Sequence, residues 1–456
     1  MSTPESGRLL DALFTTERMR AIFSDQGRVR GMLDFEAALA RAEARVGVIP
    51  APAAEAIAAR CHAELFDMAA LAQGIALSGN PAIPLVRTLT ALVARDDAEA
   101  AGYVHWGATS QDAMDTGLAL QLRDALDAFE SDLARLSGAL ARIAETHTHT
   151  PLAGRTWLQQ AVPVTFGLKA AGWLSAVERE RERERELRPR ALVIQCGGAA
   201  GTLAALGDRG LDVAAALAEE LRLGLPDLPW HAQRDRVAEV ATTLGLLVGT
   251  LGKMARDLAL LAQTEVGEAR EPDVPGRGGS STMPQKRNPV AASVALAAAV
   301  RVPALVAVML TAMTQEHERG LGGWQAEWET LPEICALAAG ALEQMARTME
   351  GLEVDAARMR ANLDLSDGLI LAEAAAMALA RHMGRARAHA LVERASRQAT
   401  EQGRQLREIL AEDAEVRAHL SAEELDRAFD PGNYLGIAVE LVDRALAARA
   451  EREAGA

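Results

Sequence analysis

Residues 237–261 read VAEVATTLGLLVGTLGKMARDLALL, and this stretch decides the fold class. Its apolar side chains recur at alternating steps of three and four residues, at Val237, Val240, Leu244, Leu247, Leu251, Met254, Leu258 and Leu261. This spacing places all of them on one face of an α-helix. We therefore expect one long helix here, buried along that face within a bundle.

Three glycines, Gly245, Gly249 and Gly252, interrupt the same stretch. Glycine weakens a helix interior, so we expect these positions to let a neighbouring helix approach closely. A bundle formed between subunits would provide that neighbour.

The composition of the whole chain extends this prediction. Hydrophobic residues make up 49% of the 456 residues and aromatic residues only 3%, so the apolar content is mainly Ala, Leu and Val, which favours closely packed helices. We predict an all-α fold with three parts, namely an N-terminal helical domain (1–107), a central long-helix bundle (108–355) and a C-terminal helical domain (356–456).

The net charge and the cysteine content limit the possible partners and the cellular compartment of the protein. A net charge of −15 argues against a nucleic-acid surface, so any anionic substrate must meet a local positive patch. The three cysteines include no C-x-x-C pair, and the N-terminus lacks a signal-peptide pattern, which favours a reducing cytoplasm. Residues 290–313 are apolar but interrupted by Ser293, Arg301 and Pro303, so we predict a buried helix and no membrane span.

Two further segments have simple structural interpretations. Residues 178–186 alternate Glu and Arg, which predicts a solvated helix face. Residues 197–202, GGAAGT, match neither nucleotide-binding fingerprint, so we predict a turn between helices.

The most specific feature is the polar loop at residues 278–289, GGSSTMPQKRNP, which separates two strongly helical stretches. Asn288 followed by Pro289 is typical of a helix start, so the loop would bring Lys286 and Asn288 to the positive end of the next helix. We expect an anion to be held there. Taken alone, the loop could equally be a connector with an ordinary cap.

A second hydroxyl-rich helix start lies at residues 107–112, GATSQD. Thr109 and Asp112 have the spacing of a capping box before an apolar helical run. By itself this pattern usually indicates only a cap.

Together these motifs resemble the fumarase/aspartase superfamily, whose signature G-S-S-x-M-P-x-K-x-N-P matches residues 279–289. The resemblance extends to segments 109–112, 154–156 and 233–236 and covers nearly the whole chain. It implies a three-domain subunit, a homotetramer around a twenty-helix core, and active sites shared between subunits.

The superfamily's chemistry is proton transfer beside a carboxylate through an aci-carboxylate intermediate. By position, the resemblance implies that Ser280 transfers the proton, with Ser281 as the alternative, and that Lys286 and Asn288 stabilise the developing dianion. Preorganised donors of this kind contribute about 3–4 kcal/mol each.

One departure from the superfamily pattern indicates the leaving group. Many superfamily lyases have His after the Arg155-Thr156 pair, but this chain has Trp157, and Asn80 stands near the place of a second histidine. A basic leaving group needs a general acid, whereas a carboxylate, whose conjugate acid has a pKa of about 4, does not.

Segments 32–36, 155–159 and 321–329 resemble bacterial 3-carboxymuconate cycloisomerases. This resemblance implies lactonisation of 3-carboxy-cis,cis-muconate to 4-carboxymuconolactone in protocatechuate (β-ketoadipate) catabolism. Gln160 stands where similar cycloisomerases often carry His.

The substrate of that reaction is a small tricarboxylate, which requires cations and hydroxyls at the site. The resemblance assigns substrate binding to Thr109, Ser110, Gln111, Thr156, Trp157, Asn80, His105, Arg319 and Gln325. His105 could equally be a packed structural residue, and His317 is a weaker candidate.

No metal or other cofactor is expected. The pairs His147/His149 and His382/His389 lack a matching carboxylate cluster.

Two alternatives remain open from the sequence. The first is a lyase of the same superfamily that acts on nitrosuccinate or adenylosuccinate. The second is a non-catalytic structural protein on the same scaffold, which the intact Ser280, Lys286 and Asn288 set disfavours.

Overall fold

The computed structural model describes residues 9–455, and α-helices account for most of them. The described residues otherwise contain two small antiparallel sheets of two strands each. The predicted all-α class is confirmed. The chain forms two compact units, of which unit 1 comprises Met1–Leu133, Glu180–Gly252 and Val294–Gln344, and unit 2 comprises Ala134–Arg179, Lys253–Ser293 and Met345–Ala456.

These units differ from the predicted three-part division, which stays a prediction. The predicted central bundle, 108–355, contributes residues to both units.

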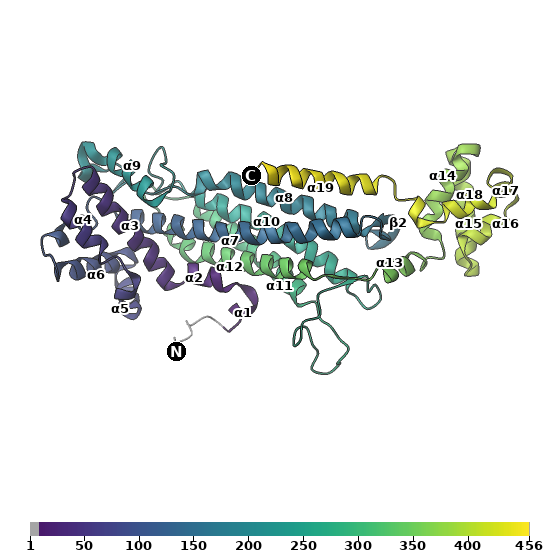
Figure 1. The fold of residues 1–456 in the computed structure, drawn as a ribbon, viewed down its shortest axis with the longest axis horizontal. Coiled ribbons are helices and arrows are strands. Elements are labelled where there is room, and N and C mark those ends of the chain that lie inside the picture. Colours follow the sequence, from purple (N-terminus) through teal and green to yellow (C-terminus); the bar gives the residue numbers. More distant parts are fainter. Residues whose placement is uncertain (1–8, 456) are drawn as a thin grey trace. The chain divides into compact units, whose positions relative to one another are not determined.

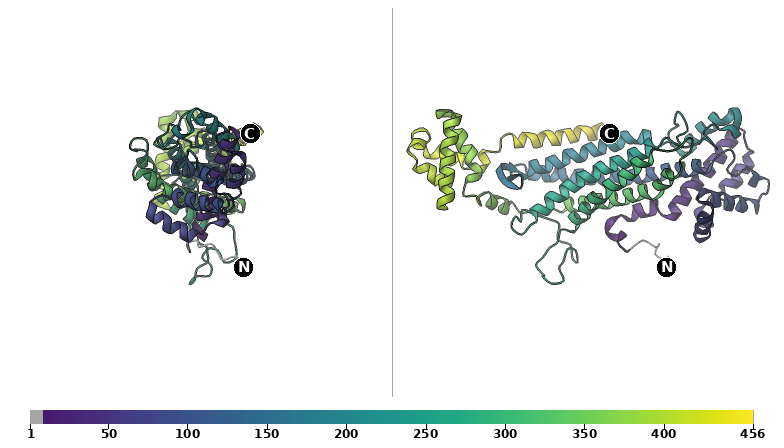
Figure 2. Two further views of the ribbon diagram at one scale, coloured as in Figure 1. Left: turned by 90° about the vertical axis from the view of Figure 1, so that its left-hand side faces the viewer. Right: turned by 180° about the vertical axis from the view of Figure 1, so that it is seen from behind.

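The long helices have bounds that run from one unit into the other. They are α7 (Ser110–Thr146), α8 (Phe166–Ala191), α10 (Asp235–Leu261), α11 (Val290–Ala312) and α12 (Gly323–Glu350). Within unit 1 their segments run side by side (Figure 1; Figure 2). Residues 237–261 lie within α10, and the eight apolar side chains at steps of three and four are all buried, as predicted.

The glycines of α10 have different surroundings. A Cβ at Gly252 would lie 2.7 Å from the Ala299 Cβ, and one at Gly245 would lie 3.1 Å from Val306, so both glycines admit α11 of the same chain. The expected close approach is present, but the neighbour is not another subunit. Gly249 has no such neighbour within 4 Å.

Unit 1 also contains shorter helices. They are α1 (Asp11–Phe14), α2 (Glu17–Ile22), α3 (Asp25–Arg45), α4 (Ala51–Ala58), α5 (Met68–Ser78), α6 (Ala82–Ala94) and α9 (Gly210–Leu221), with 3₁₀ turns at Ala63–Leu65, Ala100–Tyr103 and Ala204–Arg209. One hydrophobic cluster joins α3, α4, α6, α7 and α9. The segment 197–202 is a turn, as predicted.

The alternating charges of α8 form a solvated face only in part, at Arg179, Glu182 and Glu186. Glu180, Arg181 and Glu184 are buried within unit 1, and Arg181 donates to Glu130 of α7 at 2.9 Å. Glu180 accepts a hydrogen bond from Thr250 of α10. The predicted solvated face therefore holds for only one side of the helix, because charged side chains of neighbouring helices provide partners that the spacing within α8 does not reveal.

The described chain has two helices, α10 and α11, that are long and apolar enough to cross a membrane. In α10, 56% of the apolar window is buried, but in α11 only 28% is. The helix at residues 290–312 is therefore less buried in the single chain than predicted, and Val300 is 78% exposed.

Unit 2 contains both sheets. Strands β1 (Pro151–Thr156) and β2 (Gln159–Thr165) form a hairpin, and β3 (Ala269–Arg270) pairs with β4 (Glu353–Val354). The C-terminal helices are α13 (Ala356–Leu363), α14 (Ala372–Met383), α15 (Arg385–Gln402), α16 (Leu406–Glu412), α17 (Ala414–His419), α18 (Ala422–Ala428) and α19 (Ala438–Ala454), with 3₁₀ turns at Leu369–Leu371 and Pro431–Asn433. Helices α14–α18 gather around their own hydrophobic cluster (Figure 1).

Candidate functional site

The start of α7 brings two predicted site residues together in unit 1. The Asn80 amide donates to the Ser110 hydroxyl at 3.1 Å, and both side chains are half-buried. The Asn80 side-chain oxygen also accepts from the N–H of Ala82, the first residue of α6. Asp112 accepts from the Thr109 N–H at 3.0 Å, which is one half of the predicted capping box.

Gln111 and Arg319 are also brought together. Arg319 Nε donates to Gln111 Oε1 at 3.0 Å, and Arg319 Nη2 donates to the Ala199 carbonyl. Gln111 is fully buried, and its amide nitrogen donates to Asp115 and to the His231 carbonyl. The structure therefore places Gln111 next to Arg319 and out of contact with solvent in the single chain, and its direct role in binding a substrate stays a prediction.

The Asp112 carboxylate is bound by a set of groups that the sequence did not reveal. One of its carboxylate oxygens contacts His231 Nε2 at 2.7 Å. The N–H groups of Gly197 and Gly198 donate to the carboxylate at 3.0 and 2.9 Å. The turn at residues 197–202 therefore binds an anion, and that anion is the Asp112 side chain of the same unit.

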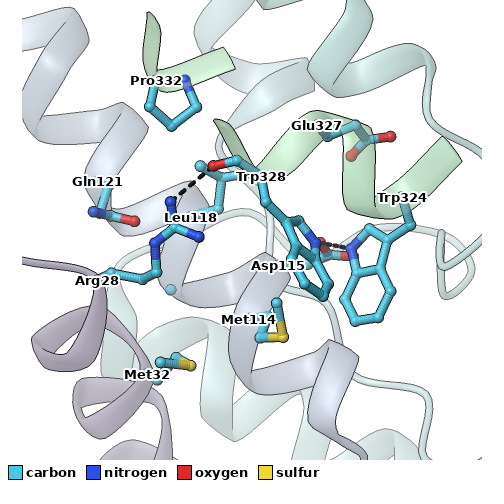
Figure 3. Close-up of a pocket in the computed structure, with 11 residues that line it drawn as sticks. Arg28, Met32, Met114, Asp115, Leu118, Gln121, Trp324, Glu327, Trp328 and Pro332 are labelled. Atoms are coloured by element: carbon cyan, nitrogen blue, oxygen red, sulfur yellow. Dashed lines mark hydrogen bonds between the residues drawn. The ribbon is translucent and has the colours of Figure 1, made fainter. Parts of the chain in front are cut away.

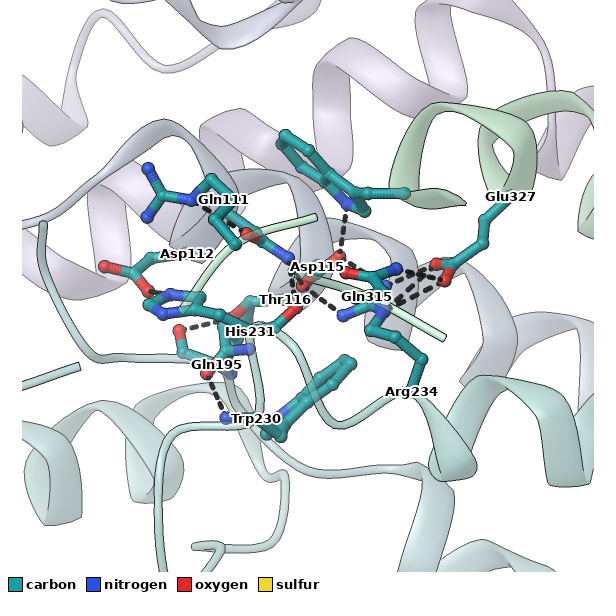
Figure 4. Close-up of polar contacts among 12 residues, drawn as sticks. Gln111, Asp112, Asp115, Thr116, Gln195, Trp230, His231, Arg234, Gln315 and Glu327 are labelled. Carbon is teal, nitrogen blue, oxygen red and sulfur yellow. Dashed lines mark hydrogen bonds and ion pairs between the residues drawn. The ribbon is translucent and has the colours of Figure 1, made fainter. Parts of the chain in front are cut away.

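A buried arginine lies next to this network (Figure 4). Arg234 of unit 1 is 1% exposed and forms ion pairs with Asp115 at 2.7 Å and Glu327 at 2.5 Å. Its guanidinium carbon also lies 4.8 Å from the centre of the Trp230 ring. Removing either carboxylate would leave a buried charge underpaired.

The half-buried His105 pairs with the buried Glu36 of α3. The Nδ1 atom lies 2.6 Å from Glu36 Oε1, and His105 has a φ of 58°, which non-glycine residues seldom adopt. Burial alone lowers the pKa of His105, but the Glu36 carboxylate and Asp112 raise it, and the net shift is upward. This arrangement favours a cationic imidazole.

Glu43 lies two helical turns after Glu36 on α3 and is fully buried. Neither of its carboxyl oxygens has a hydrogen-bond partner in the described residues. Burial, together with the Glu36 carboxylate, raises the pKa of Glu43 to about 9. Glu43 is therefore a neutral acid at pH 7.

The last predicted residue of unit 1, Gln325, is exposed. Its side-chain oxygen accepts from the Gly322 N–H at 2.8 Å, so it caps the start of α12.

A small pocket of about 40 Å³ lies between α3, α7 and α12 of unit 1 (Figure 3). Met32 and Met114 line it together with Trp324 and Trp328, whose rings pack edge to face. It contains none of the predicted site residues.

Unit 2 places Thr156 and Trp157 at the tip of the β1–β2 hairpin. Trp157 is 98% exposed and Leu158 74% exposed, with φ angles of 52° and 63°. Below the tip, Arg155 binds the buried Glu268 through two hydrogen bonds of 2.8 and 2.7 Å, and Asn362 also donates to Glu268. Arg155 is thus a support for the hairpin.

Gln160 supports the other strand of this hairpin. Its amide donates to the Asn362 carbonyl at 2.9 Å. The residue found where similar proteins often carry His therefore has a structural contact here.

The signature loop also lies in unit 2, before α11 (Figure 1). The Ser280 hydroxyl oxygen accepts hydrogen bonds from the N–H groups of Thr282 and Met283 at 3.3 and 3.1 Å. Ser281 and Lys286 are exposed, and the Asn288 N–H donates to the Gly278 carbonyl, which closes the base of the loop.

The positive end of α11 is occupied by a residue that the sequence analysis did not consider. Helix α11 begins at Val290, close to the expected start, but the Glu271 carboxylate accepts from the N–H groups of Ala291 and Ala292 at 3.1 and 2.9 Å. The prediction that Asn288 caps this helix is wrong, because the Glu271 carboxylate from the preceding segment accepts from these N–H groups instead.

Arg287 links the signature loop to β4 and to the segment before the loop. It pairs with Glu353 of β4 and donates to the Glu271 carbonyl at 2.7 Å.

The described residues contain no group of three or more His, Cys, Asp or Glu side chains that could hold a metal ion. Cys61, Cys196 and Cys335 are free and buried.

Comparisons with known proteins identify the family. A family model described as "Lyase" matches residues 13–304, and a model described as "Adenylosuccinate lyase C-terminus" matches residues 368–445. The chain belongs to this lyase family. The resemblance drawn from the signature loop is therefore confirmed at the level of the family.

Individual relatives of this lyase match over almost its full length. The 3-carboxy-cis,cis-muconate cycloisomerase of Pseudomonas aeruginosa is 62% identical, covering 98% of this chain and 97% of that protein. The crystal structure of the 3-carboxy-cis,cis-muconate lactonizing enzyme from Pseudomonas putida has a TM-score of 0.93 at 57% identity, covering 97% of this chain and 98% of that one. A nitrosuccinate lyase of Streptomyces davaonensis is 46% identical, covering 94% and 92%.

Proposed function

We propose that this lyase catalyses the lactonisation of 3-carboxy-cis,cis-muconate to 4-carboxymuconolactone. The observation that carries the proposal is the 62% identity, over 98% of the chain, to a cycloisomerase of that name. In this reaction one carboxylate of the substrate adds across a double bond of the same molecule, and the adjacent carbon is protonated.

The hairpin tip supports this choice of reaction. Thr156 is followed by Trp157, so this position offers no imidazole to protonate a basic leaving group. A carboxylate nucleophile or leaving group reacts in its ionised form and needs no such acid.

Ser280 is the proposed proton donor. Its hydroxyl oxygen accepts from two backbone N–H groups, which stabilise negative charge on that oxygen, whereas Ser281 is exposed. This environment favours Ser280 over Ser281 for a step in which the hydroxyl alternates between neutral and anionic forms. Lys286 and Asn288 would stabilise the aci-carboxylate intermediate, and Arg319 and His105 would bind substrate carboxylates.

The test is an ultraviolet assay of the purified protein with 3-carboxy-cis,cis-muconate in metal-free buffer. Loss of the diene absorbance is expected for the wild type. We expect Ser280→Ala to lower kcat by about 10²–10⁴-fold while leaving the protein folded, because it removes the proton donor. Ser281→Ala is the matched control and should retain most of the activity; the reverse ranking would transfer the role to Ser281.

A second candidate function is elimination of nitrite from nitrosuccinate. The 46% identity to a nitrosuccinate lyase favours it over other eliminations, and nitrite is also a weakly basic leaving group. Parallel assays with nitrosuccinate, adenylosuccinate and argininosuccinate distinguish these reactions. Release of nitrite or an amine, with no consumption of the muconate, would contradict the proposed lactonisation.

The proposal includes a cytoplasmic homotetramer with active sites shared between subunits. Exposed apolar residues on α10 and α11 support association, since Leu246, Val300 and Leu310 are 53%, 78% and 48% exposed. The open space beside Gly249 on α10 would admit a helix of another subunit.

A further inference from the structure

The position of Arg319 depends on a single side chain. Arg319 lies between α11 and α12, where the chain forms no helix, and its Nε donates to Gln111 Oε1 at 3.0 Å. Its other hydrogen bond goes to the Ala199 carbonyl at 3.1 Å. A guanidinium has five N–H donors, so several remain for a substrate carboxylate.

The orientation of the Gln111 amide is itself fixed. Its nitrogen donates to Asp115 Oδ2 at 3.0 Å and to the His231 carbonyl at 2.9 Å. Both partners are acceptors, so turning the amide over would place its oxygen against two other oxygens in a fully buried site. The amide oxygen must therefore face Arg319.

Asp115 is fixed in turn by Arg234, as Figure 4 shows. The guanidinium donates to both oxygens of Asp115, at 2.7 and 3.0 Å, and to both oxygens of Glu327. Arg234, Asp115 and Glu327 are each no more than 2% exposed. A planar guanidinium bound on two sides cannot rotate without breaking buried ion pairs.

We propose that Arg234, Asp115 and Gln111 form a hydrogen-bonded relay that positions Arg319 to bind a carboxylate of the substrate. The proposal rests on the proposed function, in which Arg319 contacts the substrate. Gln111 and Arg234 are positioning residues, since both are buried and act only through Arg319.

The decisive variant is Gln111→Leu in the full-length protein, which keeps a similar volume and removes the amide. Because Arg319 would lose its anchor, KM for 3-carboxy-cis,cis-muconate should rise about 10-fold, equivalent to about 1.4 kcal/mol, with kcat within about threefold of the wild type. Gln111→Asn, too short to span Asp115 and Arg319, should give the same result and serves if Gln111→Leu fails to fold.

The matched control is Gln121→Leu. Gln121 is another buried glutamine of α7, and it donates to the Ile22 carbonyl without any link to Arg319. Its loss should lower stability without raising KM. An equal rise of KM in this control would overturn the relay by showing a general effect of losing a buried amide.

A double-mutant cycle with Arg319→Ala tests whether Gln111 acts through Arg319. Adding Gln111→Leu to Arg319→Ala should raise KM no further, because the anchored group is already absent. Multiplying effects, or an unchanged KM in folded Gln111→Leu, would overturn the relay.

A crystal structure of Gln111→Leu separates the relay from the proposed function. The Arg319 guanidinium should leave its place beside residue 111, whatever the substrate. An unmoved Arg319 would overturn the relay, whereas failure of the wild type to consume the muconate would contradict only the proposed function.

Discussion

At the scale of single residues, Glu43 links burial to the pH dependence of stability. Its pKa is raised from 4.5 to about 9 by burial and by Glu36, so the folded protein holds a proton that the unfolded chain releases above pH 4.5. The free energy of unfolding contributed by this group therefore falls as the pH rises from the unfolded pKa towards about 9.

Glu43→Gln removes this titration and retains the shape of the side chain. We expect the variant and the wild type to differ little near the unfolded pKa, and the variant to become the more stable protein as the pH approaches the folded pKa. The gain should be on the order of 1 kcal/mol per pH unit, measured by urea unfolding. The exposed Glu64→Gln is the control, and a pH-independent difference would contradict the assignment.

The roles assigned to single residues from the sequence stay predictions, but the structure shows which kinds of residue the sequence can single out. Ser280, Lys286 and Arg319 were chosen because a long motif and a charge requirement single them out. Arg234, Asp115 and Glu327 were missed because each is an ordinary charged residue in sequence, and only the fold brings residues up to 212 positions apart into one ion-paired group.

At the scale of elements, Glu271 joins the signature loop to α11. Its carboxylate accepts from the N–H groups of Ala291 and Ala292, and its carbonyl accepts from Arg287. These contacts bring the segments before and after the loop together, so they define the base from which Ser280 is presented.

Glu271→Ala should lower both stability and turnover. Loss of the cap leaves two N–H groups of α11 without partners, at a cost of about 0.5–2 kcal/mol, and the loosened loop should lower kcat. Thermal unfolding and the diene assay measure the two effects. Asp273→Ala, an exposed acidic residue of the same segment, is the control, and equal effects of both substitutions would contradict a specific role for Glu271.

Helix positions were the most predictable elements. The 3,4 spacing of residues 237–261 specifies which face of α10 is buried, because a helix with that spacing has a single apolar side. The alternation of Glu and Arg in α8 did not predict which of these side chains are buried. A charge pattern within one helix does not reveal partners on neighbouring helices, such as Glu130 and Thr250.

At the scale of the whole molecule, the exposed apolar side of α11 is the feature to be explained. Val300, Val308 and Leu310 are 78%, 40% and 48% exposed in the single chain. Single exposed apolar side chains are common, but several on one helix favour the proposed contact with another subunit.

Val300→Asp should disrupt the proposed tetramer, because association would bury an unpaired carboxylate. Size-exclusion chromatography with light scattering should then show species smaller than the tetramer. Met377→Asp on α14, at a residue 48% exposed, is the control and should leave the assembly intact. A wild-type monomer, or a tetramer that tolerates Val300→Asp, would contradict the proposal for this surface.

The hairpin tip has a consequence for attempts to engineer this protein. Trp157 and Leu158 have φ angles of 52° and 63°, which Asn and Gly adopt far more readily in a two-residue turn. A stability screen would therefore favour an Asn-Gly tip, with a gain on the order of 1–3 kcal/mol per relieved residue. Such a screen would discard the exposed indole, and because Trp157 is a proposed substrate-binding residue, thermostable variants would need to be selected for turnover as well as for melting temperature.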